Sequence, residues 1–170
     1  HDVADVVGRV LRDDLELHRT LLEAERHQLA VRNAPCDAAD LLNQLSTFFR
    51  FHRCAKDRGL QIHPPPADTR FVTDGRLLMR VLINMVRNAL EATPPEGTVG
   101  VRFTWQDDRP AFHVHNAGVI DPVHQPHIFE RAFTTKGAGR GLGTYSMKLF
   151  GETFLGGRVS FTSSEGQGTE

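Results

Sequence analysis

The sequence predicts a mixed α/β sandwich preceded by a separate helical arm. A long first stretch has helical apolar spacing, later stretches have clear helix boundaries, and several short stretches alternate as strands do. Hydrophobic residues make up 39% of the 170 residues, which is enough for one packed core. The longest apolar runs are only a few residues, so the sequence predicts no membrane-spanning helix, and no signal peptide is visible.

The first element is predicted to be one long helix over residues 3–31. Two adjoining apolar stripes form a face that is wider than a two-stranded coiled-coil seam and is typical of a helical bundle. An ordinary amphipathic helix that packs on its own domain fits the same pattern. Asn33, Ala34 and Pro35 break the helix. We therefore expect two domains, over residues 1–34 and 35–170.

The second domain is predicted to alternate helices and strands. Asp37 is a suitable N-cap for a helix over about 38–57, and Asp74 for one over about 75–92 that ends before two prolines. The predicted strands are 60–63, 70–73, 98–105, 111–115 and 158–162, with a turn at 107–110. A long segment over 116–143 has little periodicity, and a helix over about 143–152 follows it.

Charge and cysteine content exclude several classes of function. The 20 Lys and Arg residues nearly balance the 21 Asp and Glu residues, for a net charge of −1. This balance excludes a broad basic surface for nucleic acid and argues against strong binding to anionic membranes. Cys36 and Cys54 lack a CxxC spacing, which favours reduced cytosolic thiols over a lone disulfide. Four histidines between residues 113 and 127 lack a clear partner for a zinc site.

The helix over 75–92 carries a polar stripe that is a candidate cation site. Asn84, Asn88 and Glu91 lie at positions i, i+4 and i+7. Two carboxamides one turn apart can offer oxygens to Mg²⁺ or to its bound waters, with phosphate oxygens completing the shell. A solvent-exposed helix face explains the same stripe.

A glycine-rich stretch just before the last predicted helix is a candidate phosphate site. Glycine recurs at positions 137, 139, 141 and 143, and Lys136 and Arg140 add positive charge. Such glycines let backbone amides approach an anion, next to a helix N-terminus. No Gly-Lys-Ser/Thr follows, so this is not a P-loop. A flexible linker has the same composition.

Four stretches in order resemble the motifs of one family. Residues 81–93 (VLINMVRNALEAT) resemble the N box of the GHKL ATP-binding superfamily. Residues 127–136 (HIFERAFTTK) resemble the F box of sensor histidine kinases, and residues 139–148 (GRGLGTYSMK) resemble their G2 box. Residues 166–169 (GQGT) resemble their G3 motif. Residues 37–60 resemble the connector helix, and residues 3–31 resemble the second helix of the dimerisation and phosphoacceptor hairpin. The resemblance implies a two-layer α/β sandwich of the Bergerat type.

The resemblance also implies where ATP and Mg²⁺ bind. Asn88 would ligate Mg²⁺ with help from Asn84, and Asn116 and Gly118 would contact adenine. The phosphates would be bound by backbone amides and cations, namely Gly139, Gly141, Leu142, Gly143, Arg131, Lys136 and Arg140. Asn84, Arg131 and Lys136 are the candidate catalytic residues. The stretch 131–141 would be a lid that nucleotide orders.

One motif departs from the family pattern. Where the family has Asp-x-Gly-x-Gly, this sequence has Asn116-Ala-Gly118-Val-Ile120. An Asn carbonyl can accept the hydrogen bond from the adenine amino group, but without charge assistance. We therefore expect nucleotide binding that is weakened.

The function that follows is that of a histidine kinase domain. It would transfer the γ-phosphoryl group of ATP to a histidine on a phosphoacceptor helix outside this sequence. The implied partners are the phosphoacceptor hairpin of its own kinase, a response regulator receiver domain and a second copy in a homodimer, but no nucleic acid. The expected location is cytoplasmic, including as part of a membrane-bound sensor.

Two alternatives stay open at this point. One is an ATP-hydrolysing switch of the gyrase, Hsp90 or MutL kind, in which a Glu at the position of Asn84 activates water. A neutral amide cannot act as that general base, which favours the kinase. The other is a nucleotide-binding scaffold with a degenerate adenine pocket.

Overall fold

The computed structural model describes residues 19–26, 29–131 and 142–170. The chain divides into two units, residues 1–32 and 33–170. In the first unit, residues 19–25 are helical and Arg26 forms a turn, while residues 29–32 have no regular structure. The prediction of a helix through residue 31 was therefore wrong at its end. Polar residues occupy positions 25–28 and offer no apolar side chain that could hold a further turn by packing.

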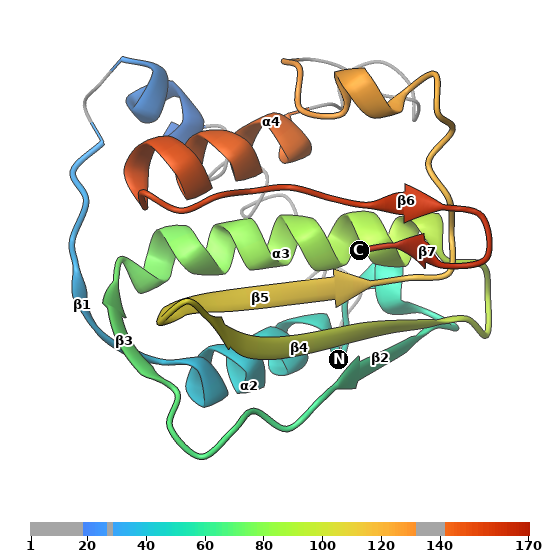
Figure 1. Ribbon diagram of the computed structural model, residues 1–170, viewed down its shortest axis with the longest axis horizontal. Helices are drawn as coiled ribbons and strands as arrows, with labels where there is room; N and C mark the ends of the chain where they lie inside the picture. Colours follow the sequence, from blue (N-terminus) through green and yellow to red (C-terminus); the bar gives the residue numbers. More distant parts are fainter. Residues whose placement is uncertain (1–18, 27–28, 132–141) are drawn as a thin grey trace. The chain divides into compact units, whose positions relative to one another are not determined.

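A three-stranded mixed sheet forms the centre of the second unit (Figure 1). Its strands are β2 (Gly59–Ile62), β4 (Thr98–Gln106) and β5 (Arg109–His115), in the order β2-β4-β5. β4 pairs in parallel with β2 and antiparallel with β5. Asp107 and Asp108 make the β4–β5 turn with φ angles of 49° and 59°. Both angles are left-handed, as a tight hairpin turn requires, and the turn predicted there is confirmed.

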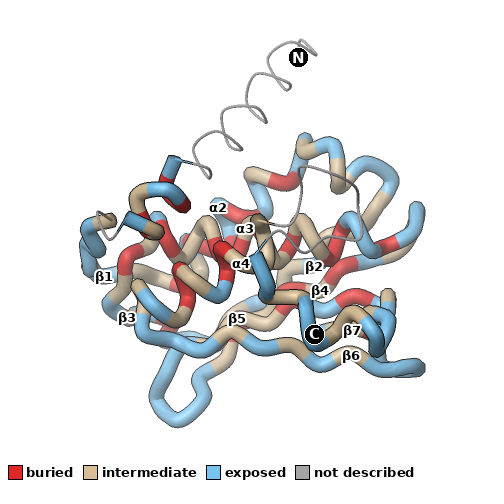
Figure 2. The backbone as a smooth tube through the Cα atoms, turned by 90° about the horizontal axis from the view of Figure 1, so that it is seen from above, coloured by how far each residue is buried: buried red, intermediate tan, exposed pale blue. Residues whose placement is uncertain are grey.

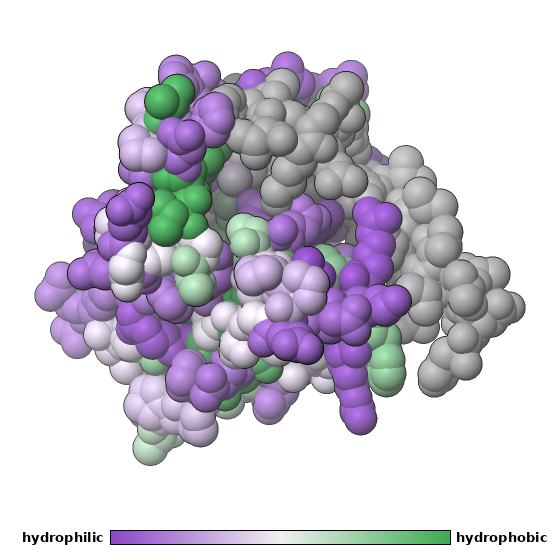
Figure 3. Space-filling view, turned by 90° about the vertical axis from the view of Figure 1, so that its right-hand side faces the viewer, coloured by the Kyte–Doolittle hydropathy of each residue, from purple (hydrophilic) through white to green (hydrophobic). Residues whose placement is uncertain are grey.

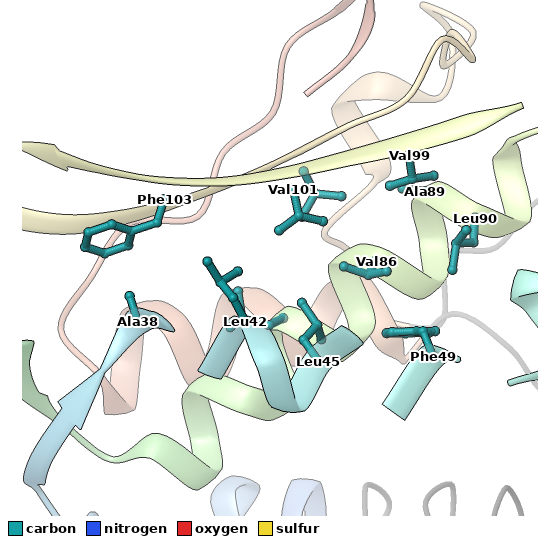
Figure 4. Close-up of a cluster of buried hydrophobic side chains, with 12 residues drawn as sticks. Ala38, Leu42, Leu45, Phe49, Val86, Ala89, Leu90, Val99, Val101 and Phe103 are labelled. Atoms are coloured by element: carbon teal, nitrogen blue, oxygen red, sulfur yellow. The ribbon is translucent and has the colours of Figure 1, made fainter. Parts of the chain in front are cut away.

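Two helices pack side by side on one face of this sheet. They are α2 (Ala38–Phe49) and α3 (Gly75–Ala92), and Figure 4 shows their side chains on the same side of β4. The core cluster that they form with the sheet includes Leu45, Phe49 and Val86 of the helices and Val99 and Val101 of β4, each at most 1% exposed. Figure 2 shows buried stretches along the helices and strands of the second unit. Burial of these apolar side chains is the main source of the unit's stability.

Two aspartates begin the helices as predicted. The backbone N–H of Ala39 donates to Asp37 Oδ1 at 2.8 Å, and the N–H groups of Arg76 and Leu77 donate to Asp74. The predicted bounds of α3 are confirmed at both ends. α2, however, ends at Phe49 and not near residue 57.

The early end of α2 has a local cause. His52 has an extended backbone, and its Nδ1 accepts the backbone N–H of Cys54 at 3.3 Å. This bond begins the short 3₁₀ helix η1 (Arg53–Ala55). The apolar residues that continued the helical pattern in sequence therefore belong to a separate turn.

A short strand that the sequence did not predict precedes α2. β1 (Ala34–Asp37) pairs antiparallel with β3 (Arg70–Thr73). Pro35 lies in β1 opposite Val72. In a pair of only two strands, an edge position tolerates a proline that lacks the N–H donor. The predicted bounds of β3 are confirmed.

The last part of the unit differs most from the prediction. α4 (Gly143–Lys148) continues as a π-helix, η3 (Leu149–Phe154), and a short 3₁₀ helix η2 (Gln125–His127) interrupts the preceding long segment. The strand predicted over 158–162 is absent. Strands β6 (Ser163–Ser164) and β7 (Gly168–Thr169) lie just beyond it. Within this stretch the N–H of Val159 donates to Glu152 Oε1 at 3.1 Å, and only Thr162, at its end, exchanges backbone hydrogen bonds of 2.9 Å with Glu170.

Candidate functional site

Asn84 lies at the centre of a hydrogen-bonded chain between α3 and α4. Its side chain is buried at 3% exposure. Asn84 Nδ2 donates to Ser146 Oγ at 3.0 Å, and Ser146 Oγ donates to the Gly143 carbonyl at 2.8 Å. Arg87 Nη2 donates to Asn84 Oδ1 at 3.2 Å. The chain of bonds ties the middle of α3 to the first turn of α4.

The structure thus brings two of the expected site residues together. A Cβ added at Gly143 would lie 3.8 Å from Asn84 Oδ1, so that oxygen faces the start of α4. Leu142, which immediately precedes α4, accepts the backbone N–H of Ser146 at 2.8 Å. The roles of Ser146 and Arg87 could not be predicted from the sequence, because an isolated serine and an isolated arginine on helices follow no pattern.

Asn88 lies one turn beyond Asn84 and is half-buried. In the described part of the chain, its side chain has no hydrogen-bond partner, so its carboxamide oxygen is available to a ligand. The described residues also hold no cluster of three or more His, Cys, Asp or Glu side chains suited to a metal ion. A cation bound here would therefore need carboxamide oxygens together with oxygens of a ligand, as Mg²⁺ on a nucleotide does.

Asn116 lies at the end of β5 and is held there by its backbone. Its N–H donates to the Thr169 carbonyl at 3.0 Å, and its carbonyl accepts the Thr169 N–H at 2.9 Å. The side chain is only 4% exposed, and its Nδ2 is buried without a hydrogen-bond partner. A buried donor without an acceptor costs about 1–3 kcal/mol. A polar ligand with an acceptor in this place would recover that cost, so the residue fits a ligand-binding role.

Gly118 lies where a larger residue would not fit. A Cβ at this position would lie 2.8 Å from Asn116 Nδ2 and 2.9 Å from the Ala92 carbonyl oxygen at the end of α3. The Thr169 hydroxyl donates to the Gly118 carbonyl at 2.8 Å and lies 2.8 Å from Ser163 Oγ. β6 and β7 therefore fix Asn116 and Gly118 beside the end of α3. The GQGT motif in the sequence indicated this stretch, but not these contacts.

The remaining expected site residues lie mostly outside the described residues. Lys136, Gly139, Arg140 and Gly141 belong to this group, as does nearly all of the expected lid. Arg131 is described and is exposed. Figure 3 shows the end of the second unit that carries the β6–β7 turn, and its described surface is mainly hydrophilic.

The described part of the second unit is thus an α/β sandwich in which an amide-bearing helix lies beside a glycine and a buried amide. The chain belongs to the histidine kinase-, DNA gyrase B-, and HSP90-like ATPase family, which matches residues 73–170. The predicted resemblance is confirmed, and the family supports ATP as the nucleotide.

The chain is similar to histidine kinases. The chain is 28% identical over 163 residues to the circadian input-output histidine kinase CikA of Thermosynechococcus vestitus, covering 92% of this chain and 21% of CikA. It is 30% identical over 135 residues to the sensor histidine kinase CusS of Escherichia coli O157:H7, covering 75% of this chain and 28% of CusS. The chain thus spans about a quarter of the length of these relatives.

The fold also matches a solved histidine kinase. The catalytic domain of histidine kinase ThkA superposes with a TM-score of 0.72 at 24% identity, covering 81% of this chain and 91% of that domain. The predicted α/β sandwich is confirmed, and the kinase relatives disfavour the hydrolytic switch. None of the helices in the described ranges is both long and apolar enough to cross a membrane.

Proposed function

We propose that this chain is the ATP-binding kinase domain of a sensor histidine kinase and transfers the γ-phosphoryl group to a histidine of a phosphoacceptor hairpin. The observation that carries the proposal is the chemistry of Asn84. Its amide is buried and hydrogen-bonded to Ser146 and Arg87. A neutral amide cannot take a proton from water, so this position does not activate water for hydrolysis. An acceptor that is itself a nucleophile, such as an imidazole, needs no such base.

The chain's own residues would act by positioning and charge neutralisation, which is most of what phosphoryl transfer requires. Asn116 and Gly118 would hold the base, and Asn88 would offer its free oxygen to Mg²⁺, which neutralises phosphate charge when bound. Asn84 Oδ1 already accepts one hydrogen bond from Arg87, so one of its two lone pairs would remain for the same cation. Arg131, Lys136, Arg140 and the amides of Gly139, Gly141, Leu142 and Gly143 complete the proposed phosphate site.

The partners belong to the same proposal. A response regulator receiver domain would take the phosphoryl group from the hairpin histidine, and two copies of the kinase would assemble through their hairpins. The first unit would supply one helix of each hairpin. The apolar stripes of its sequence support this role, since a helix with the broad apolar face that they predict needs partners.

The proposal is tested by phosphoryl transfer. The chain is incubated with γ-labelled ATP and Mg²⁺, alone and with the phosphoacceptor hairpin of its own kinase. We expect acid-labile label on the added hairpin and little on the chain itself. Failure to label a folded hairpin, together with no binding of ATP, would contradict the proposal and favour a scaffold.

A matched pair of variants tests the cation site. Asn88→Ala removes a carboxamide oxygen from α3 but keeps a good helix former. Asn43→Ala makes the same change at an exposed position of α2. Calorimetry should show at least about tenfold weaker Mg²⁺-dependent ATP binding for Asn88→Ala only, the scale on which partners in metal sites act. Equal affinities of both variants would refute the role of Asn88.

A further inference from the structure

The part of the proposed site that would hold the nucleotide base, here called the base side, carries a neutral amide that can both donate and accept hydrogen bonds. Asn116 is 4% exposed, and its buried Nδ2 lacks an acceptor. Nδ2 points toward Gly118, because a Cβ at Gly118 would lie 2.8 Å from it. The proposed function places the nucleotide base at these two residues. The inference below rests on that proposal.

An amide recognises bases differently from a carboxylate. An ionised carboxylate only accepts hydrogen bonds, so where it faces position 6 of a purine it selects the amino group of adenine and repels a carbonyl oxygen. A carboxamide pairs in two hydrogen bonds with the edge of adenine, which has an N6–H donor beside the N1 acceptor. Turned by half a rotation, the same amide pairs with a 6-oxopurine. Nδ2 then donates to O6 and Oδ1 accepts from N1–H.

The surroundings of Asn116 leave its amide free to take either orientation. Its backbone is fixed by two hydrogen bonds to Thr169. Among the described residues, however, no hydrogen bond holds the side chain. A half rotation of the amide therefore breaks no existing bond. In the orientation that the structure shows, the buried end of the amide is the donor Nδ2. The O6 atom of a 6-oxopurine is an acceptor that would satisfy this donor.

We propose that Asn116 makes this site accept 6-oxopurine nucleotides, those of guanine and hypoxanthine, alongside adenine nucleotides. The residue acts as a specificity determinant, since it changes which bases bind and takes part in no bond-making step. Relatives with an aspartate at this position would differ by rejecting the O6 carbonyl.

The test compares the binding of three diphosphates, which are not turned over. Calorimetry with ADP, GDP and IDP in Mg²⁺ is carried out on the full chain and on Asn116→Asp. For the unchanged chain we expect the dissociation constants of ADP and IDP to agree within about tenfold. Asn116→Asp should bind ADP at least as well and IDP at least about tenfold less well, the discrimination that one two-bond base contact provides.

Each outcome decides between the proposals. Binding of ADP with rejection of both GDP and IDP by the unchanged chain overturns the base inference and leaves the proposed function standing. Binding of no nucleotide overturns both. Binding of IDP without GDP supports the recognition of O6 by Asn116 but overturns the acceptance of guanine nucleotides, whose 2-amino group then prevents binding. The comparison on the unchanged chain holds even where Asn116→Asp does not fold.

Discussion

Gly168→Ala is expected to destabilise the second unit much more than Gly166→Ala, although the two glycines lie in one turn. Both have left-handed backbones, with φ angles of 76° and 78°. An alanine at either place therefore carries a similar strain of about 1–2 kcal/mol. The space around them differs. A Cβ at Gly166 meets nothing within 4 Å, whereas one at Gly168 collides with the Asn116 carbonyl oxygen and lies 3.0 Å from Ala117 Cα.

The magnitude follows from the bonds that the collision would break. To make room for the new Cβ, β7 must move away from Asn116. That movement gives up two backbone hydrogen bonds between Asn116 and Thr169, each worth about 0.5–1.5 kcal/mol. Gly166→Ala should thus lower the free energy of unfolding by about 1–2 kcal/mol, from strain alone. Gly168→Ala should lower it by about 1–3 kcal/mol more.

Urea unfolding measures both values, with the single tryptophan, Trp105, as the fluorescent probe. Calorimetry with ADP adds a second measurement. Because β7 fixes Asn116, Gly168→Ala should also lose nucleotide binding, and Gly166→Ala should keep it. Equal losses of stability in the two variants, or full ADP binding by Gly168→Ala, would show that the contact between β7 and Asn116 does not support the site.

Three further predictions concern single interactions. A double-mutant cycle of Asn84→Ala and Ser146→Ala should give a coupling free energy of about 1 kcal/mol in urea unfolding, because their hydrogen bond is buried; strictly additive losses would argue against it. Burial raises the pKa of the Cys54 thiol to about 11 from 9.0. As the pH rises, the thiol ionises in the unfolded chain before it does so in the folded unit. The free energy of unfolding should therefore fall more between pH 9 and 11 in the unchanged chain than in Cys54→Ala. Parallel curves of this free energy against pH for the two proteins would refute this. A hydrogen bond from the Thr69 hydroxyl lowers the pKa of Asp37 below 3.8. The contribution of the Asp37 carboxylate to stability is therefore present above pH 3.8 and is lost as the pH falls through the lowered pKa. An NMR titration that gives Asp37 a pKa at or above 3.8 would contradict this.

Elements with strong local boundaries could be predicted from the sequence. The bounds of α3 follow from the Asp74 cap, the apolar spacing and the prolines at 94 and 95. The end of α2 could not be predicted in this way. Apolar residues continue the helical pattern past Phe49, and a side-chain cap by His52 decides the boundary. β6 and β7 have two residues each and are held by remote partners, which periodicity does not detect.

The candidate site shows the same division between local motif and remote contact. Asn84, Asn88, Asn116 and Gly118 were identified because they lie in stretches with a motif or a helical stripe. The partner of Asn84 on α4 is 62 residues away in sequence. Such pairing is set by how α3 and α4 pack, so it becomes visible only in the folded unit.

The bond between Thr169 and Gly118 also sets an order of assembly during protein synthesis. These residues are 51 positions apart, whereas Thr104 and His113 in the β4–β5 hairpin are 9 apart. Nearby contacts close faster than remote ones, and the ribosome releases the hairpin first. The base side of the site therefore closes last, after the core between α2, α3 and β4 has formed. A nucleotide that binds this side of the site therefore acts on the finished unit, and it stabilises that unit by an amount that grows with the logarithm of the nucleotide concentration.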